Sequence, residues 1–251
     1  MKKTILLFCI LWAVNFASAQ EDINITKYQD SRLKEAVPSY ALSKVEKLIS
    51  KLKQSSESLN QDTKNDIPKL SDKDFEKLSV KEKFTYTMLY PESVSKNNLN
   101  IPAISDEENI IFGYLPDFKS NKKWSDRQIS FLTSNKKEVI ALIKESCLKD
   151  KFIGLNYKKA LVKVKAIEAI PFLIDFYKYK DSKDKDILTA LSLIVKDGRY
   201  FHYIRANIYK DLYGNDDKPV EESYIDDTAS NEEYILKTAS NFYIQYPKNK
   251  M

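Results

Sequence analysis

The sequence predicts a mainly α protein, with an irregular helical N-terminal segment followed by a HEAT-like helix-pair stack or a helical bundle. First, apolar residues recur at spacings of three and four through most of the chain between residues 39 and 245. Second, several of these stretches begin with a serine followed three residues later by an acid or an amide, which is typical of helix N-termini. Third, 43% of the 251 residues are hydrophobic, which is enough to form a core and excludes a wholly disordered chain.

The first predicted helix covers residues 39–58. Its apolar positions follow one helical stripe, formed by Leu42, Val45, Leu48, Ile49 and Leu52. Residues 59–70 are polar and contain Pro68, which indicates a linker.

Two short helices follow the linker. Ser71 has Asp74 three residues later, which predicts a helix over 72–78. Ser79 has Glu82 in the same relation, which predicts a capping box and a helix ending before a proline at position 91. Residues 91–123 have no helical pattern, and within them the tract 109–115 reads as a lone strand or a buried loop.

From residue 124 the chain predicts one helix after another. Ser125 and Gln128 form a capping box, and Asn135 caps the next helix. Asn156 precedes a third helix, and Pro171 lies in the first turn of a fourth.

Glycines mark the ends of the next two predicted helices. Gly198 ends the first, and Gly214 ends a helix over 200–212. A last helix covers about 231–245. We therefore divide the chain into an N-terminal helical segment, 20–123, and a helical domain, 124–251.

The first nineteen residues have the composition of a secretory signal peptide. Two lysines precede an apolar run over 5–16, and small residues stand at both positions of an A-x-A cleavage site. We expect cleavage between Ala19 and Gln20 and a periplasmic or secreted protein. The run is shorter than the roughly 20 residues of a spanning helix, and no second run of that length follows, so we expect no stable membrane insertion after cleavage.

One stretch of the chain resembles a known helical repeat. Residues 169–176 (AIPFLIDF), an acidic turn over 180–186 and residues 190–194 (ALSLI) follow one another. This order is similar to a HEAT unit, here about 169–197, although Asp186 and Ile187 stand where that family usually has a Val-Arg pair. The resemblance implies a scaffold that binds other macromolecules and no particular chemistry. An irregular helical bundle is the alternative.

The composition excludes several classes of site. The four glycines are too far apart for a phosphate-binding loop, and one histidine cannot supply a multi-imidazole metal centre. We predict no cofactor, no metal and no catalytic residue. Cys147 and His202 are the one possible thiol–imidazole dyad, but Cys147 falls on an apolar helical stripe, which favours a buried core thiol.

Charge is unevenly distributed along a chain of formal net charge +5. Residues 134–165 hold nine lysines against three acids, and residues 211–233 hold nine acids against one lysine. Only four arginines occur in the chain, and an exported protein meets little nucleic acid, so we expect no nucleic acid partner. A solvated lysine-rich helix face is the expected form of the basic stretch.

These features favour a non-enzymatic protein-binding scaffold of the bacterial cell envelope, whose partner is another envelope or secreted protein. Tyrosines near the HEAT-like unit are the candidate contacts, because such rings bind well in grooves. We select Tyr177, Tyr200 and Tyr203. The alternative is a carboxylate-dependent hydrolase of envelope polysaccharide that uses acids of the irregular loop. The candidates there are Asp106, Glu107 and Glu108.

Overall fold

The computed structural model describes residues 28–58, 67–95, 106–118, 121–179 and 184–246. The predicted signal peptide and its cleavage site between Ala19 and Gln20 lie outside these residues.

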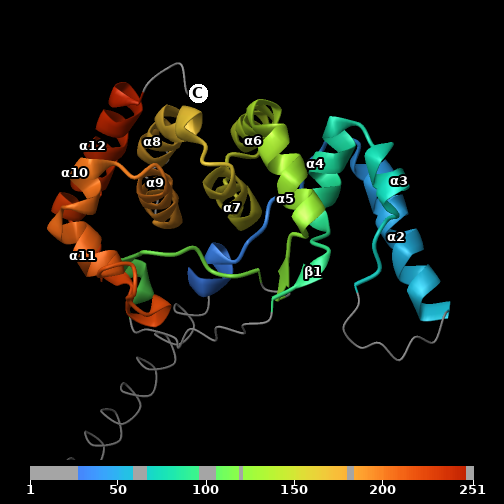
Figure 1. The fold of residues 1–251 in the computed structure, drawn as a ribbon, viewed down its shortest axis with the longest axis horizontal. Helices are drawn as coiled ribbons and strands as arrows, with labels where there is room; N and C mark the ends of the chain where they lie inside the picture. The colour runs from blue at the N-terminus through green and yellow to red at the C-terminus, as the bar shows by residue number, and fades with distance from the viewer. Residues whose placement is uncertain (1–27, 59–66, 96–105, 119–120, 180–183, 247–251) are drawn as a thin grey trace, which may run out of the picture.

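The fold is mainly α, as the sequence predicts (Figure 1). In chain order, the helices are α2 (Leu42–Ser58), α3 (Asp72–Glu76), α4 (Val80–Leu89), α5 (Asp126–Ser134), α6 (Lys136–Asp150), α7 (Leu155–Lys163), α8 (Ile170–Tyr179), α9 (Asp186–Asp197), α10 (Phe201–Ile204), α11 (Asn207–Tyr213) and α12 (Ala229–Gln245). Short strands are β1 (Ser93–Val94), β2 (Ile110–Phe112), β3 (Lys122–Lys123) and β4 (Tyr224–Asp226). Single 3-10 turns cover Glu107–Asn109, Ile167–Ala169 and Val220–Glu222.

Local capping explains where several helices begin. Both predicted capping boxes are confirmed: Ser79 with Glu82 begins α4, and Ser125 with Gln128 begins α5. The Ser71 hydroxyl accepts the backbone N–H of Asp74 and begins α3. In each case the side chain satisfies an N–H that has no partner within the helix.

The predicted position of Asn135 is confirmed, although without a capping bond, and that of Asn156 is wrong. Asn135 stands at the N-cap of α6, but its Nδ2 donates backwards to the Phe131 carbonyl and makes no cap bond. Asn156 lies inside α7, whose N-cap is Gly154. A Cβ at Gly154 would come within 2.2 Å of the backbone nitrogen of Ala36, so glycine is needed for this close approach.

The single helix predicted over 200–212 is also wrong, because α10 and α11 are separate. Ala206 adopts an extended conformation between them. On a continuous helix, residues six positions apart point about 120° away from each other. The break lets Tyr203 and Tyr209 both face the core, with ring centroids 5.4 Å apart.

The tract 109–115, predicted to be a lone strand or a buried loop, contains a buried strand. β2 pairs antiparallel with β4, matching Ile111 with Ile225 and Phe112 with Tyr224. β1 pairs with β3 in the same way. Strands of two or three residues are too short to show an alternating pattern, so β1, β3 and β4 had no sequence signature.

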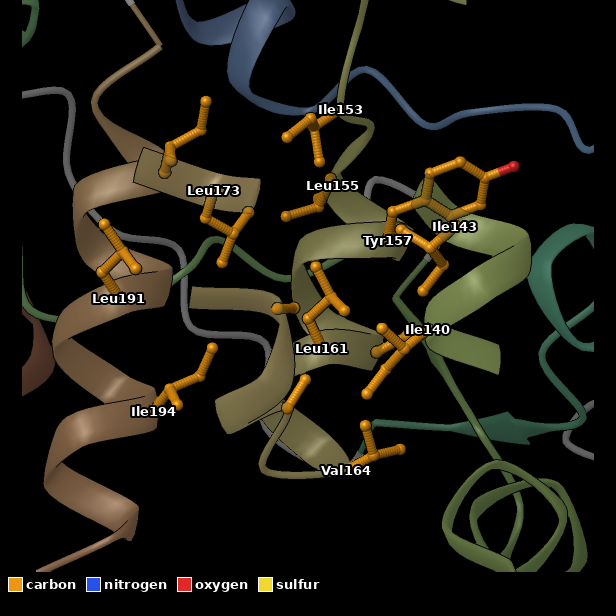
Figure 2. Close-up of a cluster of buried hydrophobic side chains, with 14 of the residues drawn as sticks. Ile140, Ile143, Ile153, Leu155, Tyr157, Leu161, Val164, Leu173, Leu191 and Ile194 are labelled. Carbon is orange, nitrogen blue, oxygen red and sulfur yellow. The ribbon is translucent and has the colours of Figure 1, made fainter. Parts of the chain in front are cut away.

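The core is continuous through the described part of the chain. The buried hydrophobic side chains form one cluster from Ala36 to Phe242, so residues from both predicted segments contribute to it. In Figure 1, α6 and α8 lie above α7 and α9. α9 packs against α7 on one side and α12 on the other, and also contacts α8. Figure 2 shows side chains of α6, α7, α8 and α9 converging, among them Ile143, Leu161, Leu173 and Leu191.

The two helices expected of the HEAT-like unit are present as α8 and α9. Their identity as a HEAT repeat stays a prediction. Among the described residues, no helix is both long and apolar enough to cross a membrane.

Candidate functional site

An apolar groove lies between α6 and α8. Its volume is about 600 Å³. It is lined by Lys144, Leu148, Lys151, Phe172, Asp175, Phe176 and Tyr179.

Helical spacing places these side chains along the groove. On α6 and just beyond its end, Lys144, Leu148 and Lys151 stand at i, i+4 and i+7, so they share one face. The α8 residues occupy 172, 175, 176 and 179 and share a face by the same rule. Leu148 and Tyr179 lie outside the buried core of their helices, whereas Phe176 is buried and also belongs to the core.

The walls expose large apolar side chains. Leu148 is 55% exposed and Tyr179 is 78% exposed. Phe172 and Phe176 on the α8 wall pack with their ring centroids 5.7 Å apart; Phe172 is partly buried and Phe176 is buried. Apolar side chains that stay exposed around a hollow are a common feature of binding sites.

Two lysines stand on the α6 side of the groove, about two helical turns apart. Lys144 Nζ donates to the Glu168 carbonyl at 3.1 Å and lies 5.8 Å from the centre of the Phe172 ring. Burial lowers the pKa of Lys144. Lys151 is exposed and adopts a left-handed conformation at the C-cap of α6. Within the described part of the chain, neither lysine forms an ion pair with a carboxylate.

The three candidate tyrosines have different environments. Tyr203 is 1% exposed and packs in the core. Tyr177 is also buried, and its hydroxyl donates to Glu232 of α12. Tyr200 is half-buried: its ring packs on Phe242 with centroids 5.3 Å apart, and its hydroxyl bonds the Gln245 side chain. Their role in binding stays a prediction, and of the three only Tyr200 presents substantial surface for it.

The predicted core thiol is confirmed. Cys147 is fully buried in α6, and burial raises its pKa well above the ordinary range of a thiol. His202 lies on the exposed face of α10, with its ring against Tyr200 and Phe201. A nucleophilic thiolate needs a lowered pKa and access to solvent, and Cys147 has neither.

The three acids of the irregular loop have different environments. Glu107 is buried, accepts a hydrogen bond from Gln29 Nε2 at 3.1 Å and lies 3.8 Å from Arg32. Asp106 and Glu108 are exposed on either side of it. Glu107 therefore joins the loop to a short helical segment over residues 28–32.

A buried ionic cluster, not found from the sequence, lies near that contact. Arg32 donates from Nη2 and Nε to Asp186 at 3.0 to 3.3 Å. Lys158 contacts Asp186 at 3.7 Å and Asp184 at 2.9 Å. Lys158 is only 1% exposed. One lysine of the basic stretch 134–165 therefore lies in the protein interior, which corrects the expectation of a wholly solvated face.

Comparisons with family models, with curated protein sequences and with solved structures found no match for this chain. The candidate site rests on its own geometry. No group of three or more His, Cys, Asp or Glu side chains among the described residues could hold a metal ion. An apolar hollow with flanking lysines can bind a complementary surface.

The groove was not predicted from the sequence, although one residue indicates it. Leu148 is out of phase with the core stripe of Ile140, Ile143 and Cys147, so it could have been recognised as a surface leucine. The position of α8 beside Leu148 could not have been recognised from the sequence, because it depends on how the helices pack.

Proposed function

We propose that this protein is a non-enzymatic binding module that docks another protein in the groove between α6 and α8, and that it does so in the bacterial cell envelope after export. The observation that carries the proposal is the pair Leu148 and Tyr179, which remain 55% and 78% exposed on the two walls of an apolar hollow. Binding hot spots combine such apolar or aromatic side chains with a concave, readily desolvated setting.

The helices that form the groove are firmly held, which favours binding because little order must be gained on association. α6 is tied to the N-terminal part of the chain by the Tyr40 hydroxyl, which donates to the Leu142 carbonyl at 3.0 Å. Lys136 on α6 pairs with Glu168, just before α8, at 2.9 Å. On the other side, the Tyr177 hydroxyl joins α8 to Glu232 of α12.

The export part of the proposal is supported by the composition of the first nineteen residues. The scaffold part is also supported by the resemblance of residues 169–197 to a HEAT unit, because such repeats present helix faces to partners.

Site-specific photo-crosslinking in the cells that make the protein tests the proposal. A photoreactive phenylalanine analogue is placed at Leu148 in one variant and at Ile244 in the matched control. Ile244 is 70% exposed on α12 and lies outside the groove. We expect a discrete protein adduct at position 148 and none of that mass at 244. No adduct at 148, or the same adducts at both positions, would contradict the proposal.

A further inference from the structure

The groove also indicates what kind of segment it accepts. We infer that its occupant is a short amphipathic helix of the partner, which presents a two-turn apolar stripe to the groove and carries acidic residues on the side that faces α6. This inference rests on the proposed function and specifies the chemistry of the partner.

The dimensions fit two helical turns. The α6 wall extends from Lys144 to Lys151 and the α8 wall from Phe172 to Tyr179. Seven residues of helix rise about 10 Å, which is two turns. A guest helix with apolar residues at i, i+4 and i+7 therefore matches the length of both walls, and about 600 Å³ accommodates a few large side chains.

The backbone chemistry of the walls favours a helical guest over an extended one. An extended segment binds best at a free sheet edge, where its N–H and C=O groups find partners. Both walls here are helices, whose backbone groups bond within their own turns. A guest entering this apolar groove must satisfy its own backbone groups, and a helix does so.

The charges favour acids on one side of the guest. Lys144 and Lys151 stand near the two ends of the α6 wall, and within the described residues neither is paired with a carboxylate. Burial against the Phe172 ring lowers the pKa of Lys144 although the Glu168 carboxylate acts in the opposite direction, so a further carboxylate on the guest would offset part of the cost of burying this charge. Asp175 stands on the opposite wall. The guest should therefore carry its acids toward α6 and none toward α8, which also fixes its direction.

The test is a selection from a display library of helical peptides of about sixteen residues, which is long enough to hold a helix in water. The library is randomised over apolar, acidic and basic residues and is selected on the full chain. Selected peptides are then measured by fluorescence anisotropy against the wild-type protein and against Leu148→Glu, Lys151→Glu and the two surface controls Ile244→Glu and Lys137→Glu.

We expect enriched peptides with apolar residues at i, i+4 and i+7 and an excess of acids along one flank. Leu148→Glu should weaken their binding by more than about tenfold. Lys151→Glu should weaken it by roughly threefold to tenfold, and exchanging the facing acid of the peptide for lysine should restore it. The two controls should bind as the wild type does.

Enriched peptides that are basic or proline-rich, or that bind Leu148→Glu unchanged, would overturn the inference. Selection of no peptide would also overturn it. Binding to vesicles of anionic lipid that depends on Leu148, with no peptide selected, would assign the groove to a lipid instead. A crosslinked partner at Leu148 whose contacting segment is not an acidic helix would leave the binding function standing and remove this inference alone. Acidic helices selected in vitro, with no adduct in cells, would leave this inference standing and contradict the proposed binding function in cells.

Discussion

The side chain of Asn156 pairs with both backbone groups of Ala36, 120 positions earlier in the chain. Its Oδ1 accepts the Ala36 N–H at 2.9 Å, and its Nδ2 donates to the Ala36 carbonyl at 2.8 Å. The amide thus acts as a short piece of β-ladder that fastens the N-terminal segment to α7. All the groups involved are buried, so water cannot replace the lost partner.

Replacing Asn156 with leucine should therefore destabilise the fold. The change leaves a buried N–H and a buried carbonyl without partners, and each costs about 1–3 kcal/mol. We expect the free energy of unfolding in urea to fall by about 2–6 kcal/mol. Asn135→Leu is the matched control, since Asn135 makes one hydrogen bond at a helix end, and it should lower stability by about 1 kcal/mol or less. Equal losses in the two variants would contradict this role of Asn156.

The pair Arg32–Asp186 should couple strongly in a double-mutant cycle. Asp186 is 1% exposed, so Arg32→Met leaves a buried carboxylate without its bidentate partner. We expect a loss of about 3–5 kcal/mol. Arg32→Met combined with Asp186→Leu should recover part of that loss, because the buried Asp186 carboxylate is then absent as well. Urea unfolding of the four proteins measures the coupling, and strictly additive losses would show that the pair is not a unit.

The capping box of α4 should make stability depend on pH. Hydrogen bonds from Lys44 and from the Ser79 backbone lower the pKa of Glu82 below its ordinary value. A lowered native pKa means that this stabilisation is present above the unfolded pKa of about 4.3 and is lost as the pH falls through the native value. We expect Glu82→Gln to be less stable than the wild type by about 1 kcal/mol at about pH 6.

At a pH below the native pKa of Glu82 the two proteins should converge, because the wild-type carboxyl is then protonated. Glu46→Gln, at an exposed position of α2, corrects for the loss of one negative charge. A stability difference that does not change between the two pH values would contradict the assignment to Glu82.

The thiol of Cys147 should react with a labelling reagent only when the protein unfolds, and it should not act as a nucleophile in the native protein. Its thiol is fully buried, and burial raises its pKa, so the reactive thiolate is both scarce and inaccessible in the native protein. At about pH 8 we expect negligible labelling by a thiol reagent in buffer and complete labelling in urea. The Cys147→Ser protein gives the background labelling. Rapid labelling of Cys147 in the native protein would contradict its place in the core.

Alanine substitutions at Tyr200 and at Tyr203 should lower the stability of the protein by different amounts. Tyr203→Ala removes a core side chain that is 1% exposed and should cost about 3–5 kcal/mol of stability. Tyr200→Ala should cost clearly less, because its ring is half-buried. Thermal unfolding measures both. If Tyr200→Ala proves as costly as Tyr203→Ala, then Tyr200 also serves the core, and it would no longer be available as a binding residue.

The sequence alone determined the features that depend on neighbours three or four positions apart. The pairs Ser79–Glu82 and Ser125–Gln128 mark the starts of α4 and α5 because the capping bonds close within one turn. The burial of Cys147 likewise follows from the phase of one apolar stripe.

Only the tertiary structure decided the features that join distant parts of the chain. The local sequence places Asn156 just before a helix, yet its partner is 120 residues away, and Arg32 contacts Asp186 across 154 residues. The strands β2 and β4 define each other only by pairing. The groove needs α6 and α8 side by side, so Leu148 and Tyr179 become one surface only after the core beneath them has packed. Local sequence fixes each helix because its hydrogen bonds are local, whereas the choice among distant partners depends on which packing buries the apolar stripes together.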